Sequence, residues 1–295
     1  MTSRLVLGAA TYGRMSQNEV NALLGAALES GITKLDTAHG YEGSETRIGF
    51  FLKNHSQFEV NTKAGLPDPT QFTPKGIRLC VEESLRRLGV ESLNTLFVHS
   101  LDSTYLSERN IEAMLSLKME GKIMRIGYSG DNENLSTAVG IPAFDDFMAT
   151  FNIIDQSNGE LIKSVQSNSE IYYKLAMGQA VWTKLELRRR IKSNKAVRFL
   201  FRKPPEPESW IDYCARFSKF QTDIVSEDFA ATFLRFALFS GTANQRVILG
   251  THSSRHIRFA AQIEQDRLNP EALTTAHYED LWSANSSPEW RAHTG

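Results

Sequence analysis

The sequence predicts an α/β fold, a (β/α)8 TIM barrel of parallel strands whose functional site lies at the C-terminal face of the barrel. Strand patterns alternate with helical patterns along most of the chain, which is typical of a parallel sheet with right-handed crossovers. The 295 residues can form one such barrel as a single domain. Three successive predicted strands also lead to titratable residues, as expected where strand ends build a site.

The first half of the chain alternates regularly. Strands are predicted over residues 4–10, 58–65 and 96–100, with a further short strand that ends at Asp36. Helical periodicity is found over residues 18–29, 43–53, 74–88 and 107–120. Gly31 and Gly89 stand where helices should stop, and Pro74 stands at the first position of its helix. These signals support the predicted boundaries.

The second half continues this order less regularly. Strands are predicted over residues 124–129, 146–152, 179–183 and 246–249. Helices are predicted over residues 227–239 and 254–266, followed by a closing helical segment over residues 270–282. We therefore expect residues 1–295 to form one barrel domain, with a variable, basic excursion around residues 187–207.

Composition describes an ordinary globular protein. Hydrophobic residues make up 41% of the chain, and the net charge of -1 gives no bias toward nucleic acid or anionic membranes. Two cysteines are too few for a disulfide framework, and no apolar run approaches membrane-spanning length. We expect a cytoplasmic protein with no nucleic-acid partner, no membrane association and no metal site. The sequence leaves the oligomeric state open.

Four polar side chains follow the ends of neighbouring strands. A loop after Asp36 presents Tyr41, and the next two strands deliver Lys63 and His99. Because the C-terminal ends of barrel strands meet at one face, these side chains are expected to converge. An ion pair, a packed tyrosine and a core histidine would explain each residue alone. The four together favour a catalytic site.

These residues resemble the aldo-keto reductase family. The motifs that carry the resemblance are Asp-Thr-Ala before Tyr41, Thr62-Lys63 and Val98-His99. The likeness extends from residues 5–8 to residues 247–250 and weakens between about 157 and 228. It implies an oxidoreductase that uses NADPH to reduce a small aldehyde or ketone, sugar-like compounds included, to the alcohol. It also implies the catalytic set Asp36, Tyr41, Lys63 and His99.

Carbonyl reduction needs a hydride on carbon and a proton on oxygen. The cofactor supplies the hydride, so the protein must supply an acid. A free tyrosine has a pKa of about 10, and a neighbouring ammonium favours its phenolate. We expect Lys63 to act on Tyr41 in this way, and Asp36 to keep Lys63 charged. By resemblance, Tyr41 is the general acid in reduction and His99 orients the carbonyl oxygen.

The cofactor site is implied by the resemblance. Ser129 matches the family's serine that holds the nicotinamide carboxamide, and Phe151 or Trp182 matches the aromatic residue that stacks on the nicotinamide. The full predicted set is Thr11, Tyr12, Asp36, Ser129, Phe151, Trp182, Thr183, Leu185, Gly250, Thr251, Ser253 and Arg255. The chain departs from the family at Gly130, where the family has asparagine or arginine, at Met148, where it has glutamine, and at Lys184, where it has proline.

Cofactor preference depends on the loop that begins at Gly250. Backbone N–H groups at the start of the following helix favour a phosphate, and Arg255 or Arg258 is a candidate for the 2'-phosphate of NADPH. Either arginine is equally explained as a surface charge, and Ala260 stands where the family has a polar contact. NADPH is therefore the favoured cofactor, with NADH as the alternative.

Other functions stay open at this stage. The basic segment 187–203 suits a lid over cofactor phosphates or a contact for an acidic substrate, and a solvated loop explains it as well. A regulatory barrel that binds nicotinamide without turnover is one alternative function. A lyase or isomerase that keeps its cofactor bound is another, because the fold alone does not determine the reaction.

Overall fold

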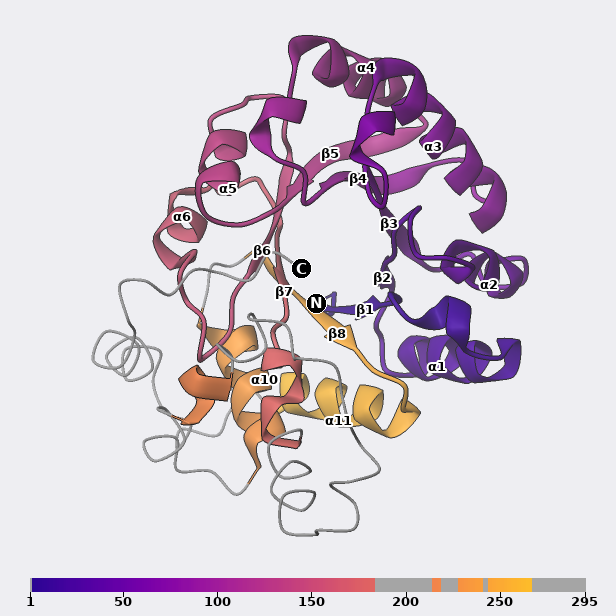
Figure 1. The fold of residues 1–295 in the computed structure, drawn as a ribbon. Coiled ribbons are helices and arrows are strands. Elements are labelled where there is room, and N and C mark those ends of the chain that lie inside the picture. The colour runs from indigo at the N-terminus through magenta and orange to yellow at the C-terminus, as the bar shows by residue number, and fades with distance from the viewer. Residues whose placement is uncertain (1, 184–213, 219–227, 241–243, 267–295) are drawn as a thin grey trace, which may run out of the picture.

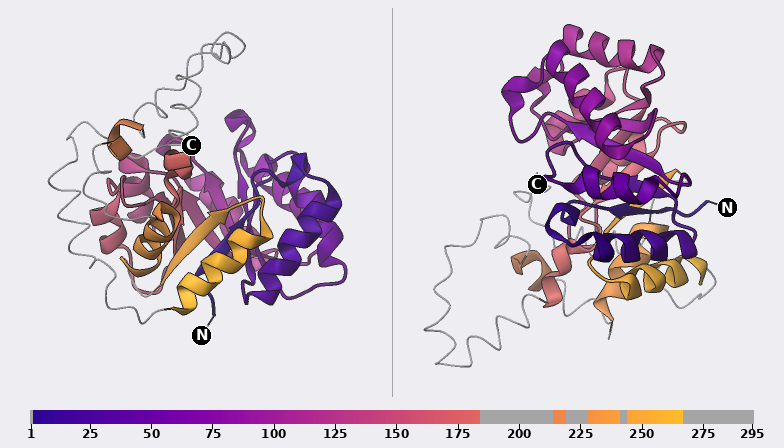
Figure 2. Two further views of the ribbon diagram at one scale, coloured as in Figure 1. Left: turned by 90° about the horizontal axis from the view of Figure 1, so that it is seen from below. Right: turned by 90° about the vertical axis from the view of Figure 1, so that its right-hand side faces the viewer.

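The computed structural model describes residues 2–183, 214–218, 228–240 and 244–266 (Figure 1). Eight parallel strands pair in chain order, and β1 pairs with β8 to close the barrel. The helices lie around the outside of the strands, as both views in Figure 2 also show. This topology confirms the predicted (β/α)8 TIM barrel.

The described elements follow the expected alternation. The strands are β1 (Leu5–Gly8), β2 (Lys34–Asp36), β3 (Glu59–Ala64), β4 (Leu93–His99), β5 (Ile123–Ser129), β6 (Asp146–Thr150), β7 (Ile171–Lys174) and β8 (Gln245–Gly250). The helices are α1 (Gln17–Glu29), α2 (Ser44–Leu52), α3 (Pro74–Leu88), α4 (Glu108–Met119), α5 (Asn132–Val139), α6 (Gly159–Ser164), α10 (Phe229–Phe239) and α11 (Ser254–Gln265). Sequence analysis identifies neither α5 nor α6, which are short helices of eight and six residues.

Local capping explains where α1 and α3 begin. At α1, the Ser16 side chain accepts a hydrogen bond from the backbone N–H of Glu19, and the Glu19 side chain accepts one from Ser16 in return. At α3, Thr73 caps the helix ahead of Pro74, and Gly89 ends it with a φ of 68°. That left-handed conformation is the one in which glycine is favoured.

The predicted position of strand seven is wrong. β7 is Ile171–Lys174, and it pairs with both β6 and β8. Its Ile-Tyr-Tyr sequence has the β-branched and aromatic residues typical of strands. The predicted strand 179–183 instead begins within the 3-10 turn Gly178–Ala180 and continues in helical conformation. A short apolar run such as Ala180-Val181-Trp182 has no periodicity that separates strand from helix.

Some predictions lie outside the described residues. These are the basic segment 187–203 with the wider excursion 187–207, Leu185, and the closing helical segment 270–282. None of the helices that the structure does describe is long and apolar enough to cross a membrane.

A small apolar cluster fills the inside of the barrel. It consists of Val6, Phe97, Met148 and Tyr172, with Ile248 packed against it. A larger cluster packs between the strands and the surrounding helices. Met148 and Ile248 also line a pocket at the C-terminal end of the strands. The inner cluster is therefore the floor on which the polar side chains of that pocket lie.

Two helical glycines give matched tests of the packing around α2, the helix that follows the Tyr41 loop. A Cβ at Gly49 would lie 2.1 Å from the Arg87 carbonyl oxygen at the end of α3, whereas a Cβ at Gly25 in α1 would meet nothing within 4 Å. We expect Gly49→Ala to lower the free energy of unfolding by about 1–3 kcal/mol because α2 and α3 must separate. Gly25→Ala should raise it by roughly 0.5–1 kcal/mol.

Urea unfolding followed by far-ultraviolet circular dichroism measures both changes. Equal effects of the two substitutions would contradict the close approach of α2 to α3.

Candidate active site

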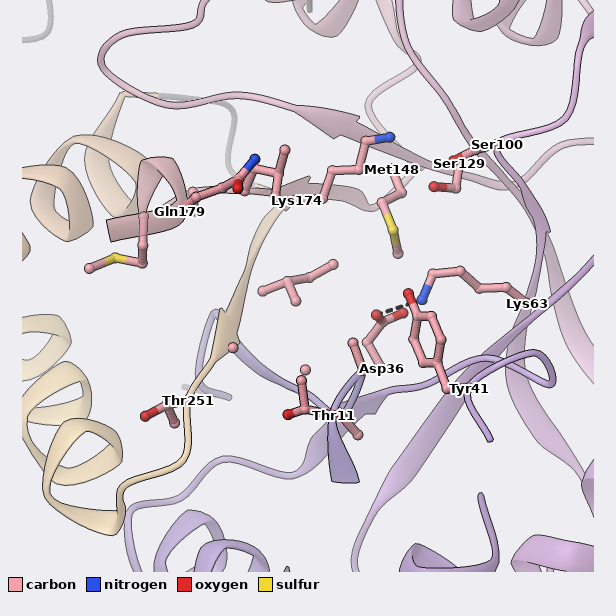
Figure 3. Close-up of a pocket in the computed structure, with 18 of the residues that line it drawn as sticks. Thr11, Asp36, Tyr41, Lys63, Ser100, Ser129, Met148, Lys174, Gln179 and Thr251 are labelled. Atoms are coloured by element: carbon pink, nitrogen blue, oxygen red, sulfur yellow. Dashed lines mark hydrogen bonds and ion pairs between the residues drawn. The ribbon is translucent and has the colours of Figure 1, made fainter. Parts of the chain in front are cut away.

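A pocket of about 450 Å³ opens at the C-terminal ends of the strands (Figure 3). This volume suits a small organic ligand. Every strand, or the loop that follows it, contributes to its lining, which includes Thr11, Asp36, Tyr41, Lys63, His99, Ser129, Met148, Lys174 and Gly250. The four predicted catalytic residues are thus brought together from β2, β3, β4 and the loop after β2.

A buried ion pair lies at the centre of this group. The Lys63 Nζ is 2.6 Å from Asp36 Oδ2 and 2.8 Å from the carbonyl oxygen of Thr37. Burial by itself would lower the pKa of Lys63, but Asp36 and Tyr41 outweigh burial and raise it. Burial raises the pKa of Asp36, and the Lys63 ammonium opposes that shift. With a contact this short, we take both partners as charged.

Tyr41 lies on the open side of this ammonium. The Lys63 Nζ is 5.2 Å from the centre of the Tyr41 ring, and Figure 3 shows the phenol oxygen pointing toward that nitrogen. Tyr41 is one of the neighbours that raise the pKa of Lys63. The Lys63 ammonium therefore lies between the carboxylate of Asp36 and the hydroxyl of Tyr41.

His99 completes the group as a neutral imidazole. Its ring meets the Tyr41 ring edge-on, with 5.5 Å between the ring centres. Burial, with the ammonium groups of Lys63 and Lys174, lowers the pKa of His99 to about 3. Its Nδ1 atom is buried and makes no hydrogen bond to the residues that the structure describes. A neutral imidazole carries one N–H, which is available to a ligand oxygen in the pocket.

Contacts outside the pocket fix the loop that presents Tyr41. Glu45, in the first turn of α2, is buried, and its carboxylate accepts hydrogen bonds from Thr62 at 2.7 Å and from Arg87 at 3.3 Å. The loop also passes so close to Gly13 that a Cβ there would lie 1.5 Å from the Glu42 carbonyl oxygen. These contacts join the Tyr41 loop to β3, to α3 and to the loop after β1.

Sequence reasoning missed Lys174, the last residue of β7. Lys174 lines the pocket, and its buried Nζ lies 3.0 Å from Oδ2 of Asp131, just beyond β5. Asp131 is fully buried, and it also accepts hydrogen bonds from the backbone of Thr150 and the side chain of Asn158. A correct position for strand seven would have placed Lys174 at a strand end, where the other site residues were found.

The predicted cofactor residues divide into two groups. Thr11, Asp36, Ser129, Gly250 and Thr251 line the pocket. Ser253 stands at the start of α11, and Arg255 is exposed in the first turn of that helix.

The other predicted cofactor residues do not line this pocket. Tyr12 is buried in the core outside it. The Phe151 ring packs against Tyr173 and Phe236, because its side chain faces α10. Trp182 packs on Phe233 with ring centres 4.9 Å apart, because β7 ends eight residues earlier than Trp182. Thr183 is exposed beside Trp182, away from the pocket.

No group of three or more His, Cys, Asp or Glu residues suited to a metal ion occurs within the described parts of the chain. Burial raises the pKa of the Cys80 thiol to about 12.

Comparisons with known proteins agree with this geometry. The model of the Aldo/keto reductase family matches residues 4–276. A D-threo-aldose 1-dehydrogenase from Pseudomonas is 32% identical over 158 residues, which cover 41% of this chain and 47% of that protein. An L-galactose dehydrogenase from Arabidopsis thaliana is 30% identical over 129 residues, 40% of each chain. The matches thus span less than half the length of these curated relatives.

Solved structures show the same fold. An aldo-keto reductase from Bacillus halodurans in its holo form has a TM-score of 0.72 at 21% identity, covering 98% of this chain and 95% of its own. One from Klebsiella pneumoniae in complex with NADPH has a TM-score of 0.69 at 17% identity, covering 98% and 93%.

The neutral His99 predicts a pH dependence of stability. Its pKa is about 3 in the folded protein and about 6.5 in an unfolded chain. The unfolded state therefore binds more protons between these values, so stability falls as the pH drops below about 6.5, by at most ~1.4 kcal/mol per pH unit from this residue. His99→Gln removes that contribution. Urea unfolding from pH 7 to pH 4 should show a shallower loss for the variant, and equal slopes would contradict the shifted pKa.

Proposed function

The chain belongs to the aldo/keto reductase family, and on that premise we propose that it uses NADPH to reduce the carbonyl group of an aldehyde or ketone in the pocket at the barrel's C-terminal face. The observation that carries the proposal is the buried ammonium of Lys63. It contacts Asp36 on one side and Tyr41 on the other, next to the neutral ring of His99. An acid, its activating cation and a hydrogen-bond donor thus face one pocket.

The residues present fit a nicotinamide cofactor. Ser129 lines the pocket, and the Ser100 hydroxyl is buried without a hydrogen bond to the described residues. The loop from Gly250 leads into the N-terminus of α11, where backbone N–H groups favour a phosphate. When bound, the reduced cofactor would supply the hydride for the carbonyl carbon. Phe151 and Trp182 lie elsewhere, so a stacking role for either is not part of this proposal.

The protein's own groups supply the proton and the orientation. His99, as a neutral imidazole, donates its N–H to the substrate oxygen and fixes the direction of the carbonyl group. Tyr41 donates its hydroxyl proton to that oxygen as the negative charge develops there. Lys63 stabilises the resulting phenolate, and Asp36 keeps Lys63 charged and aimed. In the reverse oxidation, the Tyr41 phenolate accepts the proton.

A sugar or sugar-like carbonyl is the substrate class we propose. The two relatives named as sugar dehydrogenases support it. The pocket is also lined by the hydroxyl-bearing residues Thr11, Ser129 and Thr251, which can hydrogen-bond a polyhydroxylated compound.

We propose NADPH over NADH because of the first turn of α11. Arg255 is exposed there, near Thr251 at the pocket rim, and no ion pair to a described residue is found for it. The other candidate, Arg258, is 3.0 Å from the Glu29 carboxylate on α1. Arg255 is therefore the better-placed cation for a 2'-phosphate.

Replacing Tyr41 by phenylalanine tests the general acid. We expect Tyr41→Phe to lower kcat for carbonyl reduction by roughly 10²- to 10⁴-fold, because general acid catalysis contributes about this much. The dissociation constant for NADPH should stay close to that of the wild type. Steady-state assays with an aldehyde panel, together with tryptophan fluorescence titrations, measure both quantities. Tyr105→Phe, which lies outside the pocket, is the matched control, and a variant Tyr41→Phe with full turnover would contradict the assignment.

Replacing each arginine of α11 tests cofactor preference. Arg255→Ala should weaken NADPH binding by about tenfold or more, the effect of one lost charge-assisted hydrogen bond, and leave NADH binding unchanged. Arg258→Ala should alter neither. Isothermal titration calorimetry with both nucleotides provides the comparison. Equal weakening of NADPH and NADH by Arg255→Ala would rule out a 2'-phosphate contact.

A further inference from the structure

We propose that Lys174 binds the carboxamide end of the nicotinamide, in the place where this chain carries no amide side chain. The inference rests on the proposed function, because it assumes that a nicotinamide cofactor enters the pocket. It adds a binding residue at the end of β7 that neither the sequence nor the comparisons indicate.

The position of the ammonium is the first argument. Lys174 extends from β7 over β6 to reach Asp131 just beyond β5, with 3.0 Å between Nζ and Oδ2. It therefore lies beside the strand end that carries Ser129, and Figure 3 shows it on the same side of the pocket as Ser129 and Met148. Ser129 is the residue that we expect to hold the carboxamide.

The hydrogen-bonding state of the ammonium is the second argument. The Lys174 Nζ is buried, and it forms an ion pair with Asp131 Oδ2 at 3.0 Å. An ammonium has three protons to donate, and this one carboxylate oxygen can accept only one of them. The ammonium therefore keeps donor capacity beyond its pair with Asp131, and a carboxamide oxygen is a suitable acceptor for it.

The local chemistry is the third argument. Met148 of β6 lines the pocket, and its thioether accepts hydrogen bonds only weakly and donates none. Gly130, which follows Ser129, has no side chain at all. Lys174 is thus the strong donor available between β5 and β7 among the described residues that line the pocket. Asp131 offsets its charge, so a neutral carboxamide can bind without an added anion.

Nucleotide binding tests this role without recourse to activity. Three ligands are titrated by calorimetry: NADP+, its nicotinic acid analogue, in which a carboxylate replaces the carboxamide, and 2',5'-ADP, which lacks the nicotinamide. For Lys174→Met we expect NADP+ to bind about tenfold more weakly and the carboxylate analogue roughly a hundredfold more weakly, since the latter loses a charge pair as well. The affinity for 2',5'-ADP should stay within about twofold, because this ligand does not reach Lys174.

A double variant separates binding from folding. Lys174→Met leaves the Asp131 carboxylate buried without its cation, which can destabilise the fold. The variant Asp131→Asn with Lys174→Met removes both charges, while the asparagine oxygen can still accept from Thr150 and Asn158. It should again lose more affinity for the carboxylate analogue than for NADP+, and none for 2',5'-ADP. Its melting temperature should stay close to that of the wild type. Lys163→Met on the exposed face of α6 serves as the surface control.

The outcomes are distinct. The inference is supported if both Lys174 variants lose affinity for NADP+, lose more for the carboxylate analogue and keep their affinity for 2',5'-ADP. Unchanged NADP+ affinity, or an equal loss for all three ligands, overturns the role of Lys174 while leaving the proposed function intact. A wild-type protein that binds none of these nucleotides nor NADH overturns the proposed function and this inference together.

Discussion

The burial of one ammonium group, that of Lys63, is the constraint on which the site depends. A lysine inside a barrel is stable only when an opposite charge and further acceptors replace its lost water, and Asp36 with the carbonyl oxygen of Thr37 provides them. The same charge acts on both neighbours that face the pocket. It lies 5.2 Å from the centre of the Tyr41 ring, and it helps to keep the ring of His99 neutral. One cation thus contacts Asp36, lies beside Tyr41 and lowers the pKa of His99.

Strand pairing and the contacts of the first turn of α2 fix the positions of these groups. Parallel pairing of β2, β3 and β4 brings Asp36, Lys63 and His99 to one end of the barrel, above an apolar floor. Tyr41 comes from a loop, which would ordinarily be the most mobile part of such a site. Here the buried carboxylate of Glu45 joins the start of α2 to β3 and α3, so the loop has little freedom. The Tyr41 side chain is thus held by contacts that lie outside the pocket.

The sequence predicted the barrel and the convergence of Asp36, Tyr41, Lys63 and His99 in one pocket, because both depend on where polar residues fall relative to strand ends. Asp36, Lys63 and His99 each follow a clear strand pattern, so the topology alone brings them together. The cofactor contacts were harder to predict. Every residue of β6 is buried, and so is Phe151, which follows it. An alternation of buried and exposed positions therefore does not indicate that Phe151 faces α10. The apolar run around Trp182 was predicted as strand seven, so the end of β7 at Lys174 was missed. Both failures concern strands whose side chains pack against helices or neighbours that the local sequence does not specify.

The central claim, that hydride passes from a nicotinamide to a carbonyl carbon in this pocket, can be measured directly. The wild-type protein is incubated with NADPH carrying deuterium at C4 of the nicotinamide and with a panel of aldehydes and sugar carbonyls, and the products are analysed by mass spectrometry. The account predicts an alcohol with one deuterium on the former carbonyl carbon, formed in equal amount to the NADP+ produced. Nucleotide binding without any product would contradict it in favour of a regulatory barrel. A converted substrate with no NADPH oxidised and no label would contradict it in favour of an isomerase or lyase that retains its cofactor.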